Sequence, residues 1–110
     1  MPLVSIVIPA YNAASFIGEA IESLINQTHR PLNIIVVNDG SSDNTSIVAR
    51  NALKFAQDDL LFGEVIDLQE NKGPGYALDL GFKAAKGDYI GFLAADDLYA
   101  NPAKLAIQVA

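Results

Sequence analysis

The sequence of 110 residues contains no cysteine and few basic side chains, with seven lysine or arginine residues against 13 aspartate or glutamate residues. Without cysteine, disulfides and thiolate metal sites are excluded, and a reducing compartment is allowed. The net charge of −6 disfavours nucleic acid and anionic membrane surfaces as partners. No apolar run approaches the roughly 18 residues of a membrane span, and no signal peptide pattern is present. These absences predict a cytoplasmic chain without a membrane span, in which a negatively charged ligand needs a metal bridge.

Apolar residues make up 51% of the chain, which is enough for one globular domain over residues 1–110. Runs rich in β-branched residues alternate with segments whose apolar residues recur at helical spacing. This alternation predicts an α/β fold, with an open and mostly parallel sheet joined by helical crossovers.

The expected elements follow from these patterns and from the residues that interrupt them. Strands are predicted at residues 4–8, 33–37, 64–68 and 88–93, with Pro9 closing the first. Helices are predicted at residues 15–27, from a cap at Asp43, Asn44 or Thr45 through Phe55, and at 76–86 with Gly87 ending it. Asn101 and Pro102 are expected to begin a last helix.

Polar residues follow each predicted strand. They are Tyr11 and Asn12, Asp39 and Gly40, the loop at 71–75, and the adjacent Asp96 and Asp97. The carboxyl ends of parallel strands share one edge of the sheet, where open α/β sheets bind their ligands. The four groups are therefore expected to line one site suited to a nucleotide.

The adjacent carboxylates Asp96 and Asp97 indicate a divalent cation. Two ionised carboxylates side by side repel unless they share a cation or a proton. Mg²⁺ and Mn²⁺ take oxygen ligands and are commonly held by one or two carboxylates together with substrate phosphates. A solvated acidic loop that caps a helix is the alternative interpretation of this pair.

Four segments together resemble the signatures of the family 2 glycosyltransferases with the GT-A fold, in the order of that family. They are Val-Ser-Ile-Val-Ile-Pro-Ala-Tyr-Asn at 4–12, Ile-Ile-Val-Val-Asn-Asp-Gly-Ser-Ser-Asp-Asn-Thr at 34–45, Asn-Lys-Gly at 71–73, and residues 87–97. The resemblance implies the Rossmann-like nucleotide-binding half of an inverting, metal-dependent transferase. Such an enzyme moves a sugar from a nucleotide-diphosphate sugar, here favoured to be a UDP-sugar, to a hydroxyl of a saccharide or lipid-linked acceptor.

The resemblance also implies roles for single residues. Pro9, Ala10 and Tyr11 would border the base, Asp39 would hydrogen-bond to it, and Asp96 would bind the metal at the diphosphate. The remaining residues implied for the nucleotide are Asn12, Gly40, Asn71, Lys72, Gly73 and Asp97.

By the same resemblance, the general base is expected in a later segment. Residues 1–110 would then supply the donor and metal site without the acceptor half. We then expect no transfer by this chain alone. Apolar surface near residues 103–110, left uncovered, would favour a homo-oligomer.

The chain departs from the family pattern at two places. The family motif Phe-Leu-Asp-x-Asp-Asp is replaced by Phe-Leu-Ala-Ala-Asp-Asp at 92–97, so Ala94 stands where a carboxylate is usual. An Ala-Arg-Asn motif is replaced by Ala77, Leu78 and Asp79. These departures favour an alternative, a degenerate or non-catalytic nucleotide-binding or interaction module. A phosphoacceptor domain on a flavodoxin-like sheet would need an acidic pair after the first strand, and residues 9–12 offer none.

Overall fold

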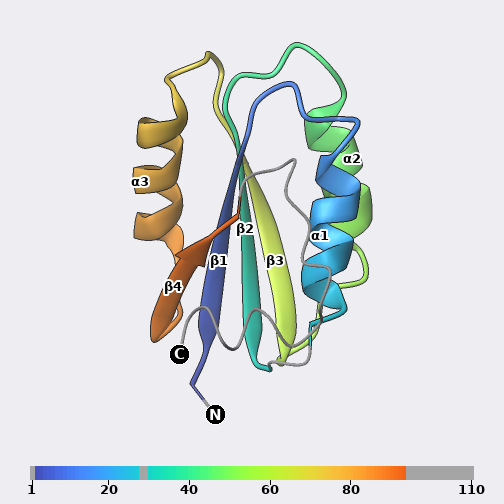
Figure 1. Ribbon diagram of the computed structural model, residues 1–110, viewed down its shortest axis with the longest axis vertical. Helices are drawn as coiled ribbons and strands as arrows, with labels where there is room; N and C mark the ends of the chain where they lie inside the picture. Colours follow the sequence, from blue (N-terminus) through green and yellow to red (C-terminus); the bar gives the residue numbers. More distant parts are fainter. Residues whose placement is uncertain (1, 28–29, 94–110) are drawn as a thin grey trace.

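The computed structural model describes residues 2–27 and 30–93 of the chain. Within these residues, four strands form one sheet in the order β3-β2-β1-β4, and every neighbouring pair is parallel. The strands are β1 (Val4–Ala10), β2 (Leu32–Asn38), β3 (Leu61–Asp67) and β4 (Tyr89–Phe92). The helices are α1 (Ile17–Ile25), α2 (Thr45–Leu53) and α3 (Pro74–Ala84). Figure 1 shows α1 and α2 on one face of the sheet and α3 on the other, which confirms the predicted α/β architecture.

The two central strands, β1 and β2, are covered on both faces and therefore consist almost wholly of apolar residues. Successive side chains of a strand point to opposite faces. Ile6 and Ile34 accordingly pack in the cluster that contains Ile21 of α1, whereas Val7 and Ile35 join the smaller cluster on the α3 side. The sheet, packed on both faces, thus positions the loops at its carboxyl edge.

Several predicted element ends differ from the structure. Pro9 does not close β1 but lies inside it, opposite Val37. On its other side β1 pairs with β4 only over Val4–Val7, so the missing N–H of Pro9 lies beyond that pairing. The third strand begins at Leu61 rather than at residue 64.

The helices also end earlier than predicted. α1 ends at Ile25 and α2 at Leu53, so that Phe55 lies outside α2 with 79% of its surface exposed. α3 ends at Ala84, and Gly87 therefore does not terminate it. Gly87 instead donates its N–H to Ser5 Oγ at 2.8 Å, and a Cβ there would lie 2.7 Å from Ser5 N.

The strand β4, predicted to be buried, is largely exposed, with exposed fractions of 47% for Tyr89, 45% for Ile90 and 59% for Phe92. The reason is that β4 has a strand neighbour on one side only among the described residues. The expected helix after Asn101 and Pro102 and the apolar surface at residues 103–110 lie outside the described residues. Within the part of the chain that is described, no helix is long and apolar enough to cross a bilayer.

Candidate functional site at the carboxyl edge of the sheet

Three loops meet where β1, β2 and β3 end, at the top of Figure 1. We call them the three site loops: residues 11–16 after β1, 39–44 after β2 and 68–73 after β3. The first residue of the second loop is tied to the end of β1, because Asp39 N donates to Ala10 O at 2.8 Å. The predicted convergence of these strand ends on one edge is confirmed.

The first two site loops are joined through Asn12. Asn12 N donates to Ser41 Oγ at 2.9 Å, and Asn12 Oδ1 accepts from Ser42 N at 2.8 Å. Asn12 has a φ of 49°, a conformation that asparagine tolerates better than most residues. The neighbouring Tyr11 is 54% exposed at the sheet edge.

Asp39 joins the second and third site loops and is only 2% exposed. Its Oδ1 accepts from Lys72 N at 2.7 Å, and its Oδ2 accepts from Gly73 N at 3.0 Å and from Asn71 Nδ2 at 3.2 Å. A carboxylate has about four acceptor positions, and donors from the described part of the chain fill three of them, leaving one at Oδ1. Asp39 therefore fixes the third loop to the second.

Gly40 allows the backbones of the second and third site loops to approach each other closely. Its φ is 66°, and a Cβ there would lie 2.3 Å from the carbonyl carbon of Glu70. Only glycine fits this approach without displacing backbone. In the third loop, Lys72 Nζ pairs with Glu70 Oε1 at 2.6 Å; the hydrogen bond and charge of Glu70 raise the pKa of Lys72.

The start of α2 is fixed to the first site loop by Asp43 and Thr45. Asp43 Oδ1 accepts from Thr45 N at 3.0 Å and from the Thr45 hydroxyl, and Asp43 Oδ2 accepts from Ala14 N at 3.2 Å. The hydrogen bond from the Thr45 hydroxyl lowers the pKa of Asp43 below its usual range. Of the three predicted cap residues, Asn44 occupies the N-cap position of α2 but its side chain makes no capping hydrogen bond. The carboxylate that accepts from the first amide of the helix is instead that of Asp43, one residue earlier.

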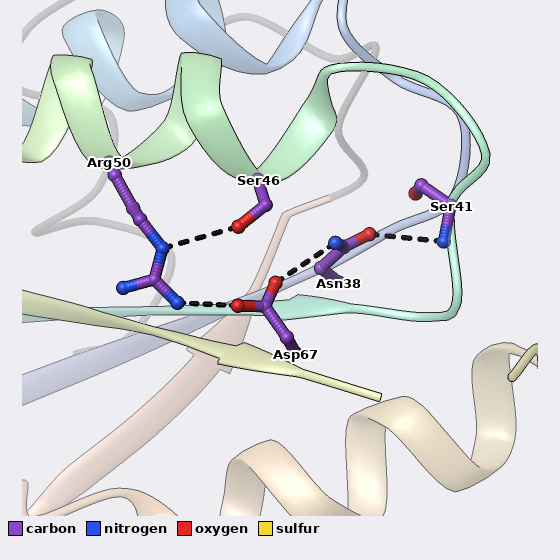
Figure 2. A network of polar contacts seen from close by, with 5 residues as sticks. All are labelled: Asn38, Ser41, Ser46, Arg50 and Asp67. Carbon is purple, nitrogen blue, oxygen red and sulfur yellow. Dashed lines mark hydrogen bonds and ion pairs between the residues drawn. The ribbon is translucent and has the colours of Figure 1, made fainter. Parts of the chain in front are cut away.

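Sequence reasoning missed a second polar group beside the site. Figure 2 shows Asn38 at the end of β2 between Ser41 and Asp67, with Arg50 and Ser46 of α2 beyond. Asn38 and Asp67 are direct register partners of β2 and β3. A signal for them exists in the sequence, because each is a polar residue at the end of an apolar strand.

The departure at Leu78 has a structural explanation. Leu78 is half-buried and packs against the apolar cluster of Val7, Ile35 and Val37. The adjacent Asp79 is exposed and pairs with Lys83 at 3.0 Å, one helical turn away. An arginine at position 78 would put a charge into this packed face.

The predicted metal ligand Asp96 and its neighbour Asp97 lie outside the described residues, as does Ala94. Within residues 2–27 and 30–93, no group of three or more histidine, cysteine, aspartate or glutamate side chains is arranged to hold a metal ion. The divalent metal therefore stays a prediction that depends on Asp96.

Comparisons with known proteins agree on one family. The family model described as glycosyl transferase family 2 matches residues 5–109. A protein of Rickettsia typhi, named an uncharacterised glycosyltransferase, is 44% identical over 110 residues, which is 98% of this chain and 31% of the relative. The chain spans between 15% and 39% of the length of the curated relatives that it matches.

Solved structures with nucleotides bound share the fold. A mannosyltransferase from Pyrobaculum calidifontis, in complex with GDP-Man and Mn²⁺, has a TM-score of 0.88 and 27% identity, covering 96% of this chain and 30% of its own. The TarS protein of S. aureus, residues 1–349 in complex with UDP, has a TM-score of 0.84 and 28% identity, with the same coverage of 96% and 30%.

Proposed function

Because the chain belongs to glycosyl transferase family 2, we propose that it supplies the donor site of an enzyme that transfers a sugar from a nucleotide-diphosphate sugar to an acceptor hydroxyl. The observation that carries this proposal is the arrangement of the three site loops, which Asp39 and Asn12 tie together at one edge of a parallel sheet. Open α/β sheets bind nucleotides at such an edge. The structural neighbours bound to GDP-Man and UDP support the same ligand class.

In this proposal the base lies against Pro9, Ala10 and the exposed Tyr11 ring, because an aromatic face suits a planar base. The free acceptor position of Asp39 takes the imide proton of a uracil, which favours a UDP-sugar. The other proposed nucleotide contacts are Asn12, Gly40, Asn71, Lys72, Gly73 and Asp97.

The proposed cofactor is Mg²⁺ or Mn²⁺, held by Asp96. When bound, such a cation offsets the charge of the diphosphate and supplies Lewis acidity at the leaving group. The net charge of −6 supports the need for a cation at the diphosphate, and the Mn²⁺ of the Pyrobaculum neighbour is consistent with that need. Aspartates alone would repel the diphosphate.

The proposed chemistry is inverting. The acceptor hydroxyl attacks the anomeric carbon as the bond from that carbon to the diphosphate oxygen breaks, and the hydroxyl proton passes to a general base. That base must lie within hydrogen-bonding reach of the acceptor. We propose that it belongs to a segment outside these 110 residues, so that this chain alone binds the donor without transfer.

Calorimetric titration with UDP and with GDP, each in Mn²⁺ and in chelator, tests the proposal. We expect at least one nucleotide to bind, and to bind more tightly with Mn²⁺. Asp96→Asn should abolish that difference, whereas Asp59→Asn, which changes an exposed carboxylate before β3, should preserve it. The absence of heat with both nucleotides would favour the non-catalytic module, and equal affinity with and without Mn²⁺ would contradict the metal role.

A further inference from the structure

The orientation of one buried amide, that of Asn38, is set by its neighbours. Asn38 is 6% exposed at the end of β2. Its Nδ2 donates to Asp67 Oδ1 at 3.0 Å, while its Oδ1 accepts from Ser41 N at 3.4 Å (Figure 2). A carboxylate can only accept, so Asp67 holds the NH₂ of this amide toward β3. The carbonyl oxygen is thereby turned toward the second site loop.

Asp67 is in turn held by α2. Arg50 Nη2 forms an ion pair with Asp67 Oδ2, and Arg50 Nε donates to Ser46 Oγ at 3.2 Å. Burial acts to raise the pKa of Asp67, but hydrogen bonds from Asn38, Arg50 and Ser46, with the charge of Arg50, outweigh it and lower that pKa. Asp67 therefore stays an ionised acceptor at neutral pH, and the orientation of the Asn38 amide persists.

The second site loop passes this constraint to the candidate site. The Ser41 N–H donates to the side-chain carbonyl oxygen of Asn38, and the Ser41 hydroxyl accepts from Asn12 N at 2.9 Å. Asp39 and Gly40 lie between Asn38 and Ser41 in the chain. A shift of the Ser41 backbone must therefore move the Asp39 carboxylate, the Gly40 contact or the Asn12 turn.

We propose that Asn38 and Asp67 are positioning residues for the donor nucleotide, acting through the second site loop rather than by touching the ligand. The nucleotide part of this inference rests on the proposed function. The expected consequence is that nucleotide affinity depends on the pairing of an amide with a carboxylate at positions 38 and 67, and not on which position holds which group.

The test compares Asn38→Asp, Asp67→Asn and the double exchange Asn38→Asp/Asp67→Asn. Asn38→Asp places two carboxylates about 3 Å apart, and their repulsion should weaken nucleotide binding by at least about tenfold. In the double exchange, the new amide at position 67 donates to the new carboxylate at position 38, whose other oxygen still accepts from Ser41 N. We expect affinity to return to within about threefold of the original, a coupling that a double-mutant cycle isolates.

Two readouts separate the outcomes: calorimetry with the better-binding nucleotide and Mn²⁺, and hydrogen exchange of the Ser41 amide. Asp59→Asn, which makes the same chemical change at an exposed carboxylate before β3, is the matched control and should change neither. The inference is overturned if Asn38→Asp binds normally. It is also overturned if the double exchange recovers thermal stability but not affinity, which is the result of a merely structural pair.

A chain that binds no nucleotide would refute the proposed function and the nucleotide part of this inference. In that case, hydrogen exchange of the Ser41 amide alone tests whether Asn38 and Asp67 position the second site loop. Faster exchange of its amide in Asn38→Asp, restored in the double exchange, would support the positioning role, and unchanged exchange would overturn it.

Discussion

At the scale of single residues, Asp39 is the side chain on which the third site loop depends. Its carboxylate accepts from the backbone N–H groups of Lys72 and Gly73, one at each oxygen. In Asp39→Asn one of those oxygens becomes an NH₂ group, which faces a donor and cannot accept. We expect the variant to lose about 1–3 kcal/mol of unfolding free energy, the usual cost of an unsatisfied buried polar group.

Chemical denaturation measures this loss, and hydrogen exchange of the Lys72 and Gly73 amides locates it. Glu64→Gln, the same chemical change at an exposed position of β3, is the control and should cost little. Unchanged exchange at both amides in Asp39→Asn would contradict the role assigned to this carboxylate.

The sequence predicted which residues would meet at this edge, but not how they bind one another. Asp39 and the Asn71–Lys72–Gly73 segment could be placed together because parallel strands deliver their ends to one side. The pairing of Asn38 with Asp67 depends on the register of two strands whose partners are 29 positions apart, and no local pattern reports that register.

At the scale of elements, Thr45 connects the start of α2 to the first site loop. It is fully buried, and its Oγ1 accepts from Ala13 N at 2.8 Å while donating to Asp43. Thr45→Val keeps the shape but leaves the Ala13 N–H without an acceptor. We expect a loss of about 1–3 kcal/mol of unfolding free energy together with faster exchange of the Ala13 amide.

Thr45→Ser is the matched control for this prediction, because it keeps the hydroxyl and removes one methyl group. It should cost roughly 1 kcal/mol through lost burial and leave the Ala13 amide protected. Equal exchange of that amide in both variants would show that the hydroxyl does not hold the loop.

The order and type of the elements could be predicted, whereas their ends could not. β3 begins at Leu61, before Gly63, since pairing with β2 from Leu32 onward overrides the weak strand preference of glycine. The family resemblance was confirmed by the match over residues 5–109. The burial of β4 was predicted wrongly because an apolar run does not reveal how many strands flank it.

At the scale of the whole molecule, the sheet formed by residues 2–27 and 30–93 ends at β4 with exposed apolar side chains. Tyr89, Ile90 and Phe92 lie there, and an edge strand also presents unpaired backbone groups. We expect copies of the chain to associate through this edge at high concentration. The net charge of −6 opposes association, so it should strengthen as salt screens that charge.

Sedimentation velocity at low and high salt tests this expectation. Phe92→Lys adds a positive charge to the exposed edge and should shift the chain toward monomer, because burying an unpaired charge in an apolar contact is costly. Phe55→Lys makes the same change at a phenylalanine that is 79% exposed beyond α2, away from β4. The Phe55→Lys variant should associate as the original chain does.

If both variants reduce association equally, general hydrophobicity rather than the β4 edge drives the association. A chain that stays monomeric at high concentration in high salt would rule out the edge contact altogether.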